Sequence, residues 1–491
     1  MNWKRQIVYQ IFVDRFKRGP NFSKKVSDGL YTRDGGQVKK WSERPSRHSK
    51  GMEFFGGDLE GIIEKMDYIS SLGVNVLYLT PIFLAKTNHK YDTHDFIVDP
   101  QFGDDKILKE LISRAHEKNI AVILDGVFNH VGADGKWFNR SKKYGVGGAY
   151  NDEKSKYKDF FHFEEWPNKY RSWHDAKILA ELNLKNEDLR RILFSDENSV
   201  IKRYLKMGID GWRLDCAHDL GHEINSLIFK SAKSVNPNAY VVGEVSTYPQ
   251  AWLKEGELDG VMNYYFANVV LGGLNGTYSP FIVKKELDRM VKEIGVDKLS
   301  NSWNMLSSHD TPRLKKLLKD EEFRKMAITL QISYPGNPLI YYGEENGMDG
   351  GEDPDNRRPM IWKEEKWDEK FRKFVIRALK IKAQESALSG GKYLELSIPS
   401  SSTLVGFARY TDNPDDTLFV FANFSSQSVE EEIPIPFSYF LSHSPSLFLL
   451  GKGEAYAKTS SLQVKLPPKM AVILKLTPAF SNYKMYKYLY E

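Results

Sequence analysis

Cysteine is almost absent from this sequence, which has only Cys216 among its 491 residues. A single cysteine excludes an intramolecular disulfide, and no Cys/His spacing typical of a metal site occurs. We interpret Cys216 as a small buried residue of a protein kept in a reducing compartment. The N-terminal residues also lack the apolar core and the cleavage site of a signal peptide, so we predict a cytoplasmic location.

An excess of charge of one sign is also lacking, since the formal net charge is only +5. The basic clusters are short and interrupted by apolar residues, and solvated helix faces explain them more simply than a nucleic-acid site does. Hydrophobic residues make up 41% of the chain and charged residues 27%, a composition typical of a soluble globular protein. We therefore expect neither a nucleic acid nor a membrane as a partner, and the sequence does not define an oligomeric state.

Short β-branched runs alternate with helical patterns along the first 390 or so residues. One such pattern places Leu59, Ile62, Ile63, Met66 and Ile69 on one stripe. Alternation of this kind predicts parallel βαβ units. Eight strands close a (β/α)8 TIM barrel, and the eight expected here are 7–13, 74–79, 120–124, 209–214, 240–242, 260–263, 303–307 and 338–342.

One connection, between Asp125 and Asp215, is longer than a helix and a loop require. We interpret 131–180 as an excursion domain that overhangs the barrel mouth, where long loops are often functional. The barrel then comprises 1–130 and 181–389. Short alternating strands after Gly390 predict a C-terminal antiparallel β-sandwich over 390–491. The tyrosine-rich tail 482–491 could be a packed helix or a contact surface.

The segment 211–215 (Gly-Trp-Arg-Leu-Asp) places an arginine and a carboxylate two residues apart at the end of an apolar run. In a β-strand this spacing puts Arg213 and Asp215 on the same face. A guanidinium in contact would lower the pKa of the carboxyl group, keep it ionised and fix its orientation, as a nucleophile requires. A second interpretation from these residues alone is that Asp215 caps the next helix and Arg213 is its solvated partner.

Polar residues gather at the predicted carboxyl ends of four strands, where barrel enzymes hold their reacting groups. Each could be a helix cap or a buried hydrogen-bonding group, but their convergence at one level of a barrel favours a site. Three carboxylates, Asp215, Glu244 and Asp310, would meet there. Like charges at close quarters push pKa values apart, so one group can act as an acid and another as a nucleophile. Carboxyl groups about 5–5.5 Å apart cleave glycosidic bonds with retention, and this chemistry needs neither a metal nor a cofactor.

Four ordered segments, 125–130, 211–215, 243–245 and 308–310, resemble the sequence regions of the α-amylase superfamily of glycoside hydrolases (family 13). The resemblance covers most of the chain, since 9–16 is similar to that family's first strand and 89–93 to the loop whose tyrosine stacks on the sugar at subsite −1. It implies that Asp215 is the nucleophile, Glu244 the acid/base and Asp310 the residue that steadies the strained sugar. It also implies that Asp125 orients Arg213, and that the same sugar is held by Tyr91, His130, Arg213 and His309.

Within the family, the sequence resembles the neopullulanase/cyclomaltodextrinase branch most. Segment 179–183 is similar to its fifth region, and 350–360 to its eighth loop, in which Asp353 and Arg357 would contact the sugar at subsite −2. There are departures: the first strand follows Met1 almost directly, where that branch usually has an N-terminal β-domain. His218-Asp219 stands where the branch has Asn-Glu, and His218 could hydrogen-bond a sugar hydroxyl. Ser246 replaces an aromatic residue.

Calcium is a further feature that the resemblance raises. Asn129 occupies a position that binds calcium in many α-amylases, and an Asp/Asn-rich loop often follows their first strand. Here that loop, 17–22, is nearly devoid of ligands, and Asp219 replaces a histidine. We therefore predict no metal and no cofactor.

The predicted function is that of a retaining α-glucan hydrolase. It would cleave α-1,4 bonds of maltooligosaccharides or cyclomaltodextrins through a covalent glycosyl-enzyme, with some transglycosylation. An alternative is a 4-α-glucanotransferase, in which a sugar hydroxyl outcompetes water. An alternative of another class is a non-catalytic glucan-binding or accessory protein of the same fold, but such proteins typically lack one or more of the three carboxylates that are present here.

Overall fold

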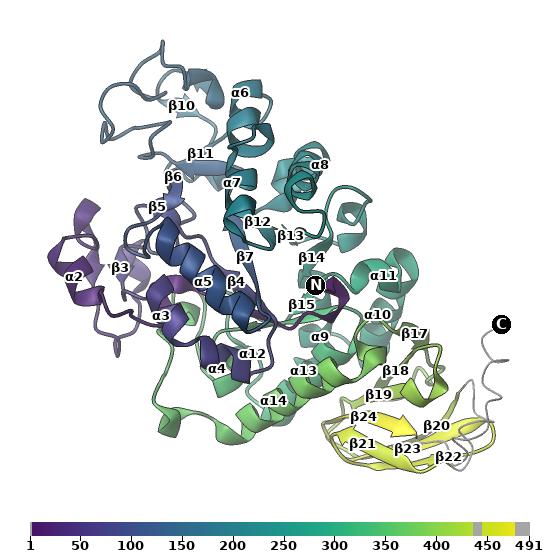
Figure 1. The fold of residues 1–491 in the computed structure, drawn as a ribbon. Helices are drawn as coiled ribbons and strands as arrows, with labels where there is room; N and C mark the ends of the chain where they lie inside the picture. The colour runs from purple at the N-terminus through teal and green to yellow at the C-terminus, as the bar shows by residue number, and fades with distance from the viewer. Residues whose placement is uncertain (1, 436–443, 477–491) are drawn as a thin grey trace.

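The computed structural model describes residues 2–435 and 444–476, and its centre is a closed barrel of eight parallel strands (Figure 1). The strands follow one another around the barrel in chain order, and β1 closes it by pairing with both β4 and β16. The predicted TIM barrel is therefore confirmed. Its strands are β1 (Val8–Ile11), β4 (Val76–Leu79), β7 (Ala121–Gly126), β12 (Gly211–Leu214), β13 (Tyr240–Val245), β14 (Gly260–Asn263), β15 (Trp303–Met305) and β16 (Asn337–Tyr341).

Helices cover the outside of the barrel (Figure 1). In α5 the buried residues are Leu108, Leu111, Ile112 and Ala115, the stripe that the 3.6-residue period predicts. The connection after β13 has only a short 3-10 turn, η7 (Pro249–Trp252). The longer helices are α3 (Leu59–Glu64), α4 (Met66–Ser71), α5 (Asp105–Glu117), α7 (Val200–Met207), α8 (Ala217–Val235), α9 (Tyr264–Leu274), α10 (Pro280–Ile294), α13 (Glu321–Ser333) and α14 (Glu369–Gln384).

The barrel interior is filled by side chains, as alternation along each strand requires. Three large aromatic residues, Tyr78, Tyr240 and Trp303, are fully buried there, and Trp303 packs against both tyrosines at centroid distances of 5.5 and 5.9 Å. The side chains on the opposite faces of the strands pack under the helices. A filled interior leaves the C-terminal ends of the strands as the place for polar chemistry.

The predicted excursion leaves the barrel after β7 and rises above its mouth (Figure 1). It is closed at its base by β8 (His130–Gly132), which pairs antiparallel with β11 (Leu179–Glu181). Within it lie β9 (Phe163–Glu165), β10 (Lys169–Tyr170) and the short turn η5 (Trp173–Asp175). Phe138 packs against Phe161, Phe163 and Tyr170 at centroid distances of 4.6–5.8 Å. This aromatic cluster gives the excursion a small core of its own.

A second overhang, which sequence periodicity did not reveal, follows β1. It contains α1 (Val13–Phe16), α2 (Phe22–Ser27), β2 (Gln37–Val38) and β3 (Glu53–Phe54). These elements are too short to show a helical or strand period over a useful window. A hairpin of β5 (Phe83–Ala85) and β6 (Thr93–Val98) follows β4. The barrel mouth is thus surrounded by three insertions.

The predicted C-terminal sandwich is also confirmed, and it packs beside α13 (Figure 1). Its five-stranded sheet has the order β17 (Lys392–Glu395), β18 (Leu404–Tyr410), β19 (Leu418–Asn423), β24 (Met470–Leu476), β21 (Ser446–Leu450), and its three-stranded sheet the order β20 (Val429–Pro434), β23 (Ser461–Leu466), β22 (Glu454–Ala457). The tail 482–491 lies outside the described residues. Among the described residues, no helix combines the length and the apolar character needed to cross a bilayer.

A buried ion pair ties the second overhang to α3. The Lys25 ammonium lies 2.6 Å from Asp58 Oδ2 and 3.2 Å from Glu60 Oε2. Asp58 also caps α3, because its Oδ1 accepts a hydrogen bond from the Gly61 N–H at 2.8 Å. Burial raises the pKa of Asp58, so its charged form depends on the lysine.

We expect Lys25→Ala to destabilise the protein by about 3–5 kcal/mol, because it leaves the buried Asp58 charge without its partner. Chemical unfolding followed by circular dichroism measures this loss. The neighbouring Lys24 is exposed, so Lys24→Ala should change the unfolding free energy by no more than about 0.5 kcal/mol. Equal losses in the two variants would contradict the assignment.

Candidate active site

Arg213 is the centre of the site and is fully buried at the end of β12. Its Nη1 lies 2.8 Å from Asp125 Oδ1 and 2.9 Å from Asp215 Oδ1, and its Nη2 lies 3.0 Å from Glu244 Oε2. β12 pairs with β7 and with β13, which brings these carboxylates to one level of the barrel. Arg213 and Asp215 therefore share a face, as their spacing predicts, and the solvated-pair interpretation is wrong for Arg213.

The electrostatics of this cluster correct one expectation. Burial raises the pKa of Asp215 well above its ordinary value, and the opposing effect of Arg213 does not reverse the shift. Burial also raises the pKa of Asp125. One guanidinium faces three carboxylates, so full ionisation would leave two excess negative charges in a buried cluster. The free site therefore favours holding a proton within the cluster, whereas the sequence had suggested a firmly ionised Asp215.

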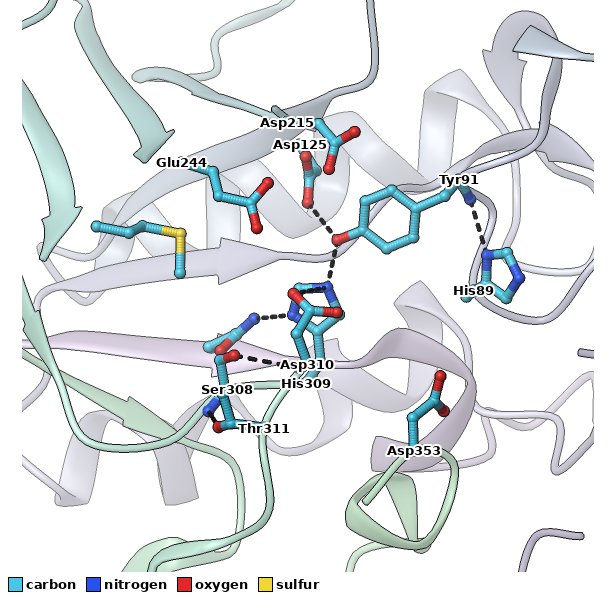
Figure 2. A network of polar contacts seen from close by, with 12 residues as sticks. His89, Tyr91, Asp125, Asp215, Glu244, Ser308, His309, Asp310, Thr311 and Asp353 are labelled. Atoms are coloured by element: carbon cyan, nitrogen blue, oxygen red, sulfur yellow. Dashed lines mark hydrogen bonds and ion pairs between the residues drawn. The ribbon is translucent and has the colours of Figure 1, made fainter. Parts of the chain in front are cut away.

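Tyr91 points its hydroxyl at Asp125 and is fixed by a chain of hydrogen bonds (Figure 2). Gln10 Nε2 donates to His309 Nδ1 at 2.7 Å, and the other ring nitrogen of His309 lies 2.5 Å from Tyr91 Oη. Tyr91 in turn donates to Asp125 Oδ2 at 2.9 Å. Burial lowers the pKa of His309 well below its usual range, so the ring is neutral and can accept at one nitrogen and donate at the other. The rings of Tyr91 and His309 are parallel within 2°.

Asp310 lies beside His309, with its Oδ2 3.2 Å from His309 Nε2, and Arg357 holds it (Figure 2). Arg357 Nη2 lies 3.2 Å from Asp310 Oδ1, and its Nη1 lies 3.0 Å from Asp353 Oδ1. The same guanidinium donates from Nε to the His309 carbonyl at 2.8 Å, and Asn356 Nδ2 donates to that carbonyl at 2.6 Å. Of the eighth-loop residues predicted for subsite −2, Arg357 thus contacts the third carboxylate directly and Asp353 is joined to it through Arg357.

His130 and His218 lie on the side of the excursion. Burial lowers the pKa of His130 to about 4. Its Nδ1 atom lies 3.5 Å from the amide nitrogen of Asn129. His218 Nε2 lies 3.5 Å from Asp219 Oδ1. His130 Nε2 and His218 Nδ1 are buried and have no hydrogen-bond partner within the described residues. Polar atoms of this kind are available to a ligand.

Three supporting residues of the carboxylates could not be identified from the sequence. The backbone N–H of Cys216 donates to Glu244 Oε2 at 2.9 Å, and Tyr264 Oη lies 3.4 Å from Glu244 Oε1. Tyr78 donates to Asp125 Oδ2 at 2.6 Å. Tyr264 directly follows β14 and Tyr78 is the next-to-last residue of β4, and a polar group near a strand end is the one signal that could have indicated them.

The structure allows a test of the calcium expectation. Asn21, the one amide of the 17–22 loop, donates to Glu60 Oε1 at 2.6 Å, and the Lys25 ammonium occupies the space between Glu60 and Asp58. A cationic side chain among the nearest carboxylates does not fit a divalent ion there. In the described part of the chain, one group of His, Cys, Asp or Glu side chains has three possible ligand atoms within 4.8 Å of one another. Its members are Asp215, Cys216 and Glu244, which belong to the reaction centre itself. The Asn129 amide nitrogen lies 3.5 Å from His130 Nδ1.

Comparison with known proteins agrees with this geometry. The family model for the alpha amylase catalytic domain matches residues 10–375. A cyclomaltodextrinase from Bacillus sp. is 36% identical over 437 residues, which cover 86% of this chain and 73% of that protein. Neopullulanase 2 from Thermoactinomyces vulgaris is 32% identical over 481 residues, or 96% of this chain and 77% of that protein. A solved structure of cyclic alpha-maltosyl-(1→6)-maltose hydrolase from Arthrobacter globiformis, in complex with that sugar, superposes with a TM-score of 0.80 at 26% identity, covering 96% of this chain and 98% of that one.

The barrel, the carboxylates around Arg213 and these matches define the class: the chain belongs to the α-amylase family of glycoside hydrolases. Within that family it is an α-glucan hydrolase of the cyclomaltodextrinase type, in agreement with the branch that its sequence resembles. The predicted family, fold and enzyme class are therefore confirmed.

The depressed pKa of His130 leads to a prediction about acid stability. The folded pKa is about 4 and the unfolded value about 6.5, so between these values only the unfolded chain binds the proton. The contribution of neutral His130 to the free energy of unfolding is fully present above pH 6.5. It is lost as the pH falls toward 4, which lowers that free energy by up to about 3 kcal/mol. Over that pH range the free energy of unfolding of the wild type should fall more steeply than that of His130→Asn. Parallel pH profiles would contradict the prediction.

Proposed function

We propose that the protein hydrolyses α-1,4-glucosidic bonds of maltooligosaccharides or cyclomaltodextrins with retention of configuration, through a covalent glycosyl-enzyme. The observation that carries this proposal is that Asp215 and Glu244 share the Arg213 guanidinium, with an oxygen of one carboxylate within 4.8 Å of an oxygen of the other. Retaining pairs are about 5–5.5 Å apart, whereas inverting pairs are about 6.5–9.5 Å apart to admit a water molecule. We keep the cytoplasmic location as a prediction.

Asp215 is proposed to attack the anomeric carbon while Glu244 donates a proton to the departing glycosidic oxygen. Water then attacks the same carbon from the vacated side, and Glu244 takes up its proton as the Asp215–sugar bond breaks. Two contacts orient Glu244 for both steps, the Cys216 N–H at Oε2 and the Tyr264 hydroxyl at Oε1. Arg213 touches both reacting carboxylates and balances the charge that moves between them.

The sugar at subsite −1 is proposed to lie on Tyr91, between Asp215 and Asp310. His309 holds Tyr91 in place, and Arg213 holds the nucleophile Asp215. Arg357 holds Asp310 from the subsite −2 side. The His130 Nε2 atom, buried and without a partner in the described residues, can hydrogen-bond a hydroxyl of this sugar. Preorganised polar groups of this kind act on the charge of the transition state without having to reorganise.

Transglycosylation follows if a sugar hydroxyl replaces water in the second step. We expect hydrolysis to dominate at low substrate and transfer to appear when sugar is concentrated. Product analysis with maltotriose distinguishes this from the alternative of a 4-α-glucanotransferase, since a transferase yields longer oligosaccharides throughout. A non-catalytic accessory protein is disfavoured, because the three carboxylates are present and held by specific partners.

The direct test is the configuration of the first product. Nuclear magnetic resonance of a fresh digest of maltotriose should show the α-anomer before mutarotation. An initial β-anomer would overturn the retaining mechanism.

Glu244→Gln should remove the proton donor while keeping its shape. General acid–base catalysis contributes about 10²–10⁴-fold, so kcat on maltotriose should fall by about that factor or more. An aryl glycoside with a good leaving group needs less protonation and should lose less in the glycosylation step. The exposed Glu255→Gln serves as the matched control. Equal losses for both substrates would show that Glu244 is not the acid.

The absence of a metal requirement is also proposed, supported by the Lys25 ammonium that lies between Asp58 and Glu60. Activity on maltotriose should survive exhaustive treatment with EDTA. A loss of activity that calcium restores would contradict this proposal.

A further inference from the structure

The acceptor side of the site lacks the aromatic residue expected after the acid/base. Ser246, at that position, is exposed and offers no ring. Tyr248 is the next candidate along the loop, but its hydroxyl donates to Glu293 at 2.7 Å. Its ring packs edge-on against Tyr265 and under the Arg289 guanidinium. Tyr248 is thus committed to contacts with α9 and α10 and does not supply the missing face.

Trp173 approaches the site from a different part of the chain, the η5 turn of the excursion. Its ring stacks on His130 at a centroid distance of 5.2 Å and an interplanar angle of 28°. Its indole N–H donates to Asp219 Oδ2 at 3.0 Å. The tryptophan therefore bridges the histidine of subsite −1 and a residue four positions beyond Asp215.

The fold explains why a residue so distant in sequence arrives there. Ser172 forms a β-bridge with Ala180 of β11, and β11 pairs with β8 so that Glu181 lies opposite His130. His174 and Asp175 then reverse the chain with φ of 46° and 59°, a left-handed conformation that non-glycine residues adopt at a cost. The indole is held over His130 by this turn.

Two polar atoms without a hydrogen-bond partner in the described part of the chain belong to residues at or next to the contacts that Trp173 makes. His130 Nε2 and His218 Nδ1 are both buried, and neither has a hydrogen-bond partner in the described residues. His218 directly precedes the Asp219 that holds the indole. Trp173 itself is half-buried, with the His130 ring stacked on it and the His174 ring edge-on at a centroid distance of 4.5 Å. An aromatic ring beside buried polar atoms that lack hydrogen-bond partners is the combination that recognises a sugar ring and its hydroxyls.

We propose that Trp173 determines specificity on the acceptor side: its indole is the aromatic wall against which the glucosyl unit next to Glu244 binds as leaving group or acceptor, and Asp219 positions it. This inference rests on the proposed α-glucan hydrolysis. In this arrangement the excursion supplies the aromatic ring that is absent from the loop at Ser246.

The test compares two substrates that differ only beyond the bond that is cleaved. Maltotriose places a sugar on the acceptor side, whereas the fluoride of α-maltosyl fluoride leaves without occupying that side. Trp173→Ala should raise KM and lower kcat/KM for maltotriose by about tenfold, the effect of one aromatic contact. For α-maltosyl fluoride kcat/KM should change by less than about twofold, and transfer to added maltose should decline.

Two further variants make the test specific. Trp173→Phe keeps a ring but loses the bond to Asp219, so it should retain more maltotriose activity than Trp173→Ala. Trp166, in the same excursion, is also half-buried and donates its indole N–H to the Ala149 carbonyl at 2.9 Å. Trp166→Phe should leave both substrates unaffected.

The outcomes separate this inference from the proposed function. Equal losses on both substrates in Trp173→Ala would show that the tryptophan only supports His130, and unchanged kinetics on both would show that it touches no sugar. A phenylalanine variant as impaired as the alanine variant would exclude stacking. Each of these overturns the inference while hydrolysis by the wild type stands. A wild type that cleaves neither substrate would instead overturn the proposed function.

Discussion

Arg213 carries a positive charge sealed inside the barrel mouth, and the arrangement of the site follows from that charge. A buried guanidinium must be paired, and carboxylates taken out of water need a cation in turn. β12 provides Arg213 and neighbours β7 and β13, so Asp125, Asp215 and Glu244 converge on it from adjacent strands. Loss of Arg213 would leave three carboxylates at the barrel mouth without their cation, which makes this arginine a requirement of stability as well as of chemistry.

Much of this protein could be predicted from periodicity. The eight strands were recognised because parallel strands buried on both faces are short apolar runs, and the site because polar residues at several strand ends have no structural need to coincide. The excursion was recognised from its length. Each strand, each strand-end residue and the length of the excursion can be read within one segment of the chain.

The remainder depends on contacts between distant segments. The pairing of Gln10 with His309, or of Trp173 with Asp219, has no local pattern and arises only when the loops fold over the barrel. The overhang at 12–58 escaped notice because its elements are too short to show a period. The pKa direction of Asp215 depends on its depth of burial beside two other carboxylates, which a motif of five residues cannot express.

The paired strands β8 and β11 form the base of the excursion beside His130, and ion pairs from Lys136 to Asp95 and from Lys143 to Asp34 tie it to the neighbouring insertions. The residues between β8 and β11 contribute none of the barrel strands that carry Asp215 and Glu244. The excursion can therefore be exchanged as a unit where the replacement also fits these neighbours. Replacing residues 131–180 by the corresponding segment of another family member would change the surface above the reacting carboxylates as one unit. Asp215 and Glu244, which cleave the bond, would stay unchanged. Diversification of glucan preference in this architecture can thus proceed by replacing one surface module, with no redesign of the reacting groups.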